Sequence, residues 1–387
     1  MNDLLERHFL ERTYKYLVGK IKKSLDNVDK KEVYKFLDAL KSGMDDKRVT
    51  VDGAGRSLQS VLLLVSQLEN TYGIRVNQVN NANLRPLRGG DIFVANSRSA
   101  KVEPEEAKIV SHARFARKKG LDVFFITANE EIKDIFENVI LIKKEGYNKE
   151  YAPLGTGFEQ ATATLMSCIA CSYYKKNPKE SFDTLCKEVI QGYNRNLETL
   201  LKQDRALDAF IEIVNEYLSI ENPGVVYFKG MGINDIIAKV IAIRYGHLHK
   251  NNCKDLNVVY ESHWRCRRSN DLGIFLSGSG QTTQMIKYLS QAKSIGMKTF
   301  VITSYKDSKL ARSNQWYKNC RGNLIISGRS IKYSYFNQAL ETIDEAFFPQ
   351  FELNTYLTLD ALLALIAKYN NIDEEDMKKT HRDKELE

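Results

Sequence analysis

The stretch from Ser277 to Thr283 is dense in small and hydrogen-bonding side chains. In order it reads Ser, Gly, Ser, Gly, Gln, Thr and Thr, between an apolar run that ends at Leu276 and a helical pattern. Glycine lets backbone amides come close to a ligand, and a helix N-terminus attracts anions. A helix cap needs only one or two such residues. The sequence therefore predicts a phosphate-binding loop that contains Ser277, Gly278, Ser279, Gln281, Thr282 and Thr283.

Two nucleotide-binding motifs are absent from the glycine-rich loops. No Gly-Lys-Ser/Thr follows the serine loop, so it is not a P-loop. The stretch Gly53-Ala54-Gly55 follows a strand-like run, but Leu58 stands where a dinucleotide-binding loop has its third glycine. A phosphate on a small molecule is therefore favoured over a nucleotide.

The elements around these loops occur twice in the same order. Strand-like runs, glycine turns and apolar helices recur at a spacing of roughly 180 residues, too long for a solenoid repeat. The matching landmarks are Gly53 and Gly230, Asp91 and Asp271, Gly120 and Gly296, and Glu159 and Glu352. The sequence therefore predicts a duplicated domain.

Apolar strands that alternate with helices predict an α/β fold with parallel sheets covered on both faces. We expect two duplicated doubly wound, flavodoxin-like domains that form a pseudo-dimer. The predicted domains are 1–177 and 178–387, with Asn177-Pro178 as the linker, because the residue before proline disfavours helix. Each begins with a long amphipathic helical region, at about 3–45 and 178–220.

Two carboxylates occupy matching places in the repeat. Glu159 and Glu352 each follow phenylalanine at the head of an apolar helix. An acid in the first turn is favoured by the helix dipole, which is a purely structural role. A carboxylate tuned by burial is also suited to take a proton next to a sugar carbonyl. Both interpretations remain open at this point.

Composition limits the classes of partner. The 387 residues include 57 basic and 49 acidic side chains, and the net charge of +8 is spread along the chain. Such a diffuse excess suits small anions as well as nucleic acid. No apolar run is long enough to span a bilayer, and the first residues do not resemble a signal peptide. Six scattered cysteines suggest reduced thiols and a cytoplasmic location, and we expect Cys168 and Cys171 to be buried rather than zinc ligands.

In combination, these motifs resemble the sugar isomerase (SIS) domain, and within it the 6-phospho-3-hexuloisomerase family. The likeness covers nearly the whole chain in two copies. It rests on Gly-Ala-Gly-Arg-Ser at 53–57, Ser-Gly-Ser-Gly-Gln-Thr at 277–282, the stretch 152–159 and the ending Met377 to His381. The resemblance implies a phosphosugar held by the serine loop and isomerised by proton transfer without a cofactor or metal. It also implies acid–base roles for a glutamate at the start of the long helix and for a histidine across an interface. The candidates are Glu352, Glu159, His247 and His381.

The two copies depart from the family pattern in different places. Arg98 stands where the first serine loop should have glycine, and Ile233-Asn234 replace Arg-Ser in the second half. We therefore expect one composite site on the second half's serine loop, completed by Arg56 and Ser57. Arg98 and Lys101 could bind a second anion or fill a dead site, and residues 263–268 could form a lid or a solvated loop. The remaining predicted phosphate-binding residues are Gly53, Ser97, Ser99, Gly230 and Asn234.

The sequence thus predicts an isomerase for a phosphorylated sugar of the hexulose 6-phosphate type, acting through an enediol(ate). One alternative is a phosphosugar-binding protein without catalytic activity. Another is a phosphoglucose/phosphomannose isomerase or an aminosugar-phosphate isomerase. We expect a homodimer and neither nucleic-acid nor membrane binding.

Overall fold

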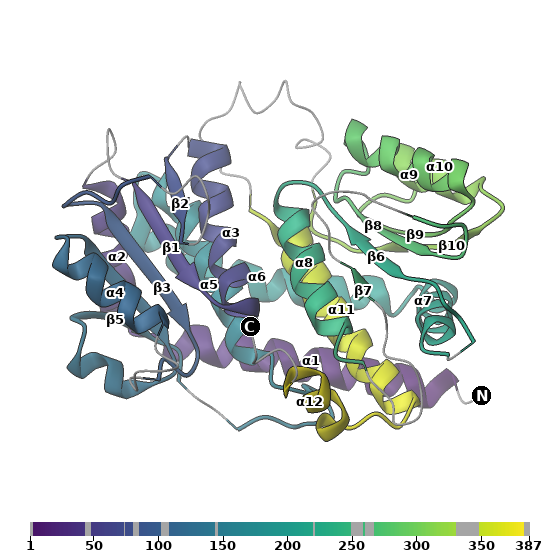
Figure 1. The fold of residues 1–387 in the computed structure, drawn as a ribbon, viewed down its shortest axis with the longest axis horizontal. Coiled ribbons are helices and arrows are strands. Elements are labelled where there is room, and N and C mark those ends of the chain that lie inside the picture. Colours follow the sequence, from purple (N-terminus) through teal and green to yellow (C-terminus); the bar gives the residue numbers. More distant parts are fainter. Residues whose placement is uncertain are drawn as a thin grey trace.

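The computed structural model describes residues 3–42, 48–72, 74–79, 85–101, 108–143, 146–219, 221–248, 258–259, 267–329 and 348–382. Two five-stranded sheets stand apart in Figure 1, and every strand pair in both is parallel. The first has the order β2-β1-β3-β4-β5, and the second has the matching order β7-β6-β8-β9-β10. The strands are β1 (Val49–Gly53), β2 (Val76–Gln78), β3 (Ile92–Ser97), β4 (Asp122–Thr127), β5 (Asn138–Leu141), β6 (Val226–Lys229), β7 (Val258–Val259), β8 (Leu272–Leu276), β9 (Lys298–Thr303) and β10 (Cys320–Ile325). The predicted α/β fold with two flavodoxin-like sheets is confirmed.

Helices connect and cover the strands. In the first half they are α1 (Asp3–Asn27), α2 (Lys30–Lys41), α3 (Gly55–Tyr72), α4 (Lys108–Lys118), the short 3-10 helix Glu130–Asp134 and α5 (Gly157–Tyr173). In the second half they are α6 (Pro178–Leu200), α7 (Asp204–Tyr217), α8 (Ile233–Tyr245), α9 (Thr283–Ile295), α10 (Lys309–Gln315), α11 (Gln350–Tyr369) and α12 (Glu374–Arg382). Each long helical region predicted at the start of a half is two helices. The first break lies at Asp29, whose side chain caps α2 by accepting from the Lys31 amide.

The core lies between the two sheets. α5 and α11 are buried on all sides, as expected for helices that are apolar around their whole circumference. α3 packs on α5 and on α8, and α8 packs on α11, so these four helices join the halves (Figure 1). The predicted burial of Cys168 and Cys171 on α5 is confirmed.

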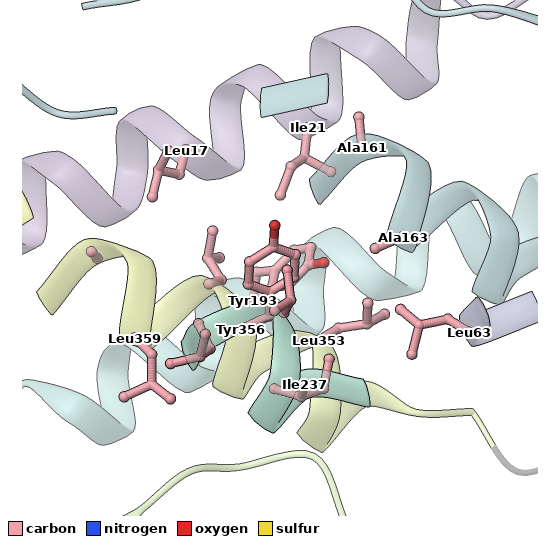
Figure 2. Packing of buried hydrophobic residues seen from close by; sticks show 14 of the residues in the cluster. Leu17, Ile21, Leu63, Ala161, Ala163, Tyr193, Ile237, Leu353, Tyr356 and Leu359 are labelled. Atoms are coloured by element: carbon pink, nitrogen blue, oxygen red, sulfur yellow. The ribbon is translucent and has the colours of Figure 1, made fainter. Parts of the chain in front are cut away.

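The first helix of each half reaches the buried helices of the other. α1 runs along the base of the molecule and packs on both α5 and α11, while α6 packs on α5 (Figure 1). Figure 2 shows the result, with Leu17 and Ile21 of α1 and Tyr193 of α6 gathered around Tyr356 of α11. One hydrophobic cluster therefore spans both sides of position 177, and the domain boundary at 177/178 stays a prediction. Within the described ranges, no helix is long and apolar enough to cross a membrane.

Candidate functional site

The serine loop leaves the carboxyl end of β8 and leads into α9. The Gly280 amide donates to Ser277 Oγ at 3.2 Å, and the Gly278 carbonyl accepts from the Ser304 amide at 3.0 Å. Gly280 has φ +58°, and an added Cβ there would lie 2.3 Å from Ser308 Oγ. Only glycine fits that position, since both the backbone conformation and the close contact exclude a side chain.

The end of this loop has hydrogen-bond donors that are not used to cap α9. Thr282 is the N-cap of α9 but makes no side-chain capping bond. The first amides of any α-helix have no intrahelical acceptor, so those of α9 are available to an anion. Ser277 is buried, Ser279, Gln281 and Thr282 are partly exposed, and Thr283 is exposed. The geometry suits an oxyanion at the helix N-terminus.

A buried carboxylate lies beside this loop. Glu352, in the first turn of α11, is fully buried, and its Oε1 accepts from Asn234 Nδ2 at 2.9 Å and from Arg329 Nη2 at 2.5 Å. No described residue hydrogen-bonds to its Oε2. Arg329 also lies against the loop, because an added Cβ on Gly278 would be 2.8 Å from Arg329 Nε. Arg329 therefore connects the serine loop to Glu352, a carboxylate whose Oε2 accepts no hydrogen bond from a described residue.

The matching loop of the first half is built in the same way. The Ala100 amide donates to Ser97 Oγ at 3.1 Å, and the Arg98 carbonyl accepts from the Ala128 amide at 3.1 Å. Ala100 has φ +38° where the second half has Gly280, so the turn is retained with a non-glycine residue. Ser97 is partly exposed and Ser99 is exposed. The main difference is Arg98 at the place of Gly278.

Glu159 has a different neighbour from Glu352. Its Oε2 lies 3.8 Å from Arg56 Nη1, and Arg56 also donates to the carbonyls of Gly155 and Leu154. Burial is the largest single effect and opposes the charge of Arg56, but Glu159, Tyr356, Asp360 and Tyr147 together outweigh it, so the pKa of Arg56 is raised. The structure thus places Arg56 with the glutamate of its own half, whereas we expected it to complete the second half's serine loop.

The backbone residues predicted for the first βα loops lie where expected. Gly53 and Gly230 end β1 and enter the turn after β6, and an added Cβ on Gly230 would lie 2.2 Å from the Asn234 carbonyl. The Ser57 carbonyl accepts from Asn96 Nδ2 at 2.6 Å. Both turns bring backbone close to backbone, so glycine is needed there.

His247 lies at the far end of α8 from the residue that binds Glu352. His247 is buried just beyond the end of α8, and its Nδ1 lies 2.8 Å from Thr380 Oγ1 of α12. Asn234, which holds Glu352, is in the first turn of α8, and at the helical rise of ~1.5 Å per residue the other end of that helix lies about 16 Å away. His247 therefore packs against α12 in this chain, and its acid–base role stays a prediction. The backbone of His381 lies in α12, but its side chain, like residues 263–266, falls outside the described structure.

Sequence reasoning missed two features of these loops. The first is Arg329, which follows β10. Its position just beyond a parallel strand could have identified it as a site residue, because ligand-binding loops lie at the carboxyl ends of such strands. At the end of β1, Asp52 lies 2.8 Å from Nδ1 of His112 on α4. Among the residues the structure describes, no group of three or more His, Cys, Asp or Glu could hold a metal ion.

Comparison with other chains gives one domain match and distant relatives. The SIS domain family matches residues 219–320. An uncharacterized protein of Archaeoglobus fulgidus is 28% identical over 198 residues, covering 50% of this chain and 95% of that protein. An uncharacterized protein of Aeropyrum pernix is 30% identical over 164 residues, covering 42% of this chain and 74% of that protein.

Solved structures share the whole two-sheet arrangement. Tagatose-6-phosphate ketose/aldose isomerase from Escherichia coli has a TM-score of 0.56 at 15% identity, covering 92% of both chains. The C-terminal domain of glucosamine-fructose-6-phosphate aminotransferase from Francisella tularensis has a TM-score of 0.61 at 11% identity, covering 93% of this chain and 96% of that one. At these identities the likeness concerns the fold alone.

Proposed function

We propose that this chain is a phosphosugar isomerase. The premise is that it belongs to the same family as the Aeropyrum pernix protein and carries a SIS domain. The observation that supports this most is that Arg329 connects the serine loop to a buried carboxylate. Arg329 is bound to Glu352 and lies against Gly278, so a phosphate site and a proton acceptor stand side by side.

In the proposed reaction, the phosphate of a hexulose 6-phosphate binds to Ser277, Ser279, Gln281, Thr282, Thr283 and the first amides of α9. Glu352 removes a proton from the carbon next to the sugar carbonyl, which gives an enediol(ate), and returns it to the former carbonyl carbon. The hydroxyl proton of the neighbouring carbon passes to the original carbonyl oxygen, so the carbonyl group moves by one carbon. Asn234 and Arg329 hold Oε1, which leaves Oε2 to take the proton. Binding at the remote phosphate fixes the position of the reacting carbons, and catalysis depends on that geometry.

The test uses the matched glutamates of the two halves. The protein is incubated in deuterated water with a panel of hexose and hexulose 6-phosphates, including aminosugar phosphates, and deuterium incorporation and interconversion are followed. Glu352→Gln should lower the rate by about 10²–10⁴-fold, because the amide cannot accept the proton. Glu159→Gln is the control and should keep most of the activity. Equal losses in both variants would contradict the assignment of the base to Glu352.

The second candidate is a phosphosugar-binding protein without catalysis. It is favoured by the first half, where Arg98 replaces glycine in the loop and Arg56 neighbours Glu159. Binding of a phosphosugar by the unmodified chain with no deuterium exchange for any member of the panel would select this function.

We also propose that the chain forms a homodimer and that its two halves meet at 177/178. Two-chain assemblies would present two copies of the serine loop. Analytical ultracentrifugation that shows only the mass of a single chain at micromolar concentration would reject the dimer.

A further inference from the structure

A buried carboxamide on α6 holds the backbone that leads into Arg329. Asn196 is fully buried, and its Oδ1 accepts from the Ser327 amide at 2.9 Å and from the Ser327 hydroxyl at 3.3 Å. The Ser327 carbonyl accepts from Asn354 Nδ2 of α11 at 2.8 Å. Both backbone groups of Ser327 are therefore bound by side chains, which fixes the peptide planes on either side of it.

The residues next to Ser327 are fixed as well. The Ile326 carbonyl accepts from Ser304 Oγ at 2.8 Å. Gly328 has φ +124°, and an added Cβ there would lie 2.5 Å from the Phe351 amide nitrogen. The backbone conformation and the close contact both exclude a side chain at this position. The chain between β10 and Arg329 therefore follows one path across the first turn of α11.

The other end of the Asn196 carboxamide is anchored in the core between the halves. Its Nδ2 donates to the hydroxyl of Tyr14 on α1 and to the hydroxyl of Thr358 on α11, both at 3.0 Å. A backbone amide can only donate, so the atom that faces Ser327 must be the oxygen of the carboxamide. Since its oxygen and its nitrogen are both bound, Asn196 cannot rotate without losing buried hydrogen bonds.

The position of this segment determines where the Arg329 guanidinium lies. Its Nη2 donates to Glu352 Oε1, and its Nε lies against Gly278 of the serine loop. Ser327 is two residues before Arg329, so a shift of the backbone there moves the guanidinium relative to both groups. A misplacement of ~1 Å from a distant change can slow a reaction by about 10²-fold.

We infer that Asn196 is a positioning residue for the proposed proton transfer. It touches the reaction only through Arg329: its hydrogen bonds go to Ser327, Tyr14 and Thr358. This role rests on the proposed function of Glu352 as the base. It makes the orientation of a residue in the second half's site depend on α6 and on a hydroxyl from α1.

The kinetic test compares two substitutions in the same hydrogen-bond network. Asn196→Ala frees the Ser327 amide, and it should lower kcat in the deuterium-exchange assay on the order of 10²-fold, with a smaller change in KM. Thr358→Val is the matched control, because it removes one partner of Nδ2 and leaves the bonds to Ser327 and Tyr14 in place. It should lower the midpoint of thermal unfolding but keep most of kcat.

A double variant separates positioning from a loss of stability. In an Arg329→Gln background, Asn196→Ala should cause no further loss of kcat, because the residue through which it acts is gone, while its effect on thermal unfolding should remain. Asn354→Ala, which frees the Ser327 carbonyl instead, provides the same comparison if Asn196→Ala does not fold. Equal kcat values in Asn196→Ala and Thr358→Val, or an undiminished loss of kcat in the Arg329→Gln background, would overturn the inference.

Crystal structures of the two single variants give a measurement that needs no turnover. The contact between Arg329 Nη2 and Glu352 Oε1 should be broken in Asn196→Ala and kept in Thr358→Val. A contact that is kept in both variants would overturn the inference. If the unmodified chain exchanges deuterium with no phosphosugar, the proposed function fails, and this comparison still decides whether Asn196 positions Arg329.

Discussion

Two glutamates at matching places in the fold have acquired different surroundings. Glu352 is bound through one oxygen by Asn234 and Arg329, whereas Glu159 lies 3.8 Å from Arg56. The first βα loop supplies an arginine in the first half, but Ile233 occupies its place in the second. There the arginine comes from the loop after β10 instead. A positive charge beside the carboxylate has thus been kept, while its origin in the chain has changed.

Arg329→Gln should destabilise the protein and slow the proposed reaction. The variant leaves the buried Glu352 carboxylate with Asn234 as its hydrogen-bonding partner, at a cost of about 1–3 kcal/mol for the lost charged bond. Urea unfolding of Arg329→Gln, Glu352→Gln and the double variant measures the coupling. If the change in the free energy of unfolding in the double variant equals the sum of the changes in the two single variants, Arg329 and Glu352 have no interaction energy and the prediction is contradicted.

The loops after β3 and β8 have the same backbone conformation in the two halves. The serine loop and its counterpart share two hydrogen bonds and a left-handed residue, Gly280 in one and Ala100 in the other. At the far side of the molecule, α12 returns to the first half. Its Glu374 accepts from the Leu154 amide at 3.1 Å and pairs with Lys378 at 3.1 Å. This contact fastens the end of the described chain to the segment that precedes α5.

Reciprocal substitutions at Ala100 and Gly280 should change the stability of the protein in opposite directions. Ala100→Gly relieves a positive φ and should stabilise the protein by up to about 1 kcal/mol. Gly280→Ala places a Cβ 2.3 Å from Ser308 Oγ at φ +58°, so it should destabilise by more than that and weaken phosphosugar binding. Thermal unfolding and a binding titration of both variants make the comparison. A stabilising Gly280→Ala would contradict the described loop.

The contribution of Glu374 should depend on pH. Burial opposes its charge, but hydrogen bonds from Lys378, Tyr147 and the Leu154 amide outweigh that effect, so the pKa of Glu374 is lowered from its ordinary value of 4.5. A carboxyl with a depressed folded-state pKa stabilises the protein above the unfolded pKa and loses that contribution as pH falls through the folded one.

The midpoint of thermal unfolding should therefore be lower in Glu374→Gln than in the unmodified chain at about pH 7, and the difference should shrink at about pH 3.5. Glu375→Gln is the control: Glu375 pairs with the same Lys378 at 2.8 Å but is exposed, so solvent screens that ion pair and the midpoint should change less than in Glu374→Gln. A Glu374→Gln effect that is constant over this range would exclude the proposed ionic contact.

The whole molecule behaves as two sheets with one core. Leu17 of α1, Ala163 of α5, Tyr193 of α6 and Tyr356 of α11 belong to the same cluster (Figure 2). Asp360, which pairs with Arg244, also accepts hydrogen bonds from Thr156 and Gln160 of the other half. Neither half can bury its long helix without elements of the other.

The chain should therefore unfold in one cooperative transition rather than two. Differential scanning calorimetry should give equal calorimetric and van't Hoff enthalpies, and the separate segments 1–177 and 178–387 should lack a sharp transition. Two well-separated transitions in the whole chain would show that the halves are energetically independent.

Local sequence was sufficient for the framework. Apolar runs that end in glycine or serine and lead into helices depend on neighbouring residues, so the strands, their parallel arrangement and the positions of the two serine loops could be predicted. The duplicated order made the matching sheets predictable as well.

Only the tertiary structure decided which side chains meet. Arg329 lies far from Gly278 in sequence, yet both stand at the same sheet edge because parallel strands end together. Asn234 lies in the first turn of α8 and His247 just beyond the end of that helix, so its length separates them, and Arg56 lies beside Glu159 of its own half. Spacing along the chain specifies which face or end a residue occupies, but contacts between elements depend on how helices cross the sheets, and no local pattern records that.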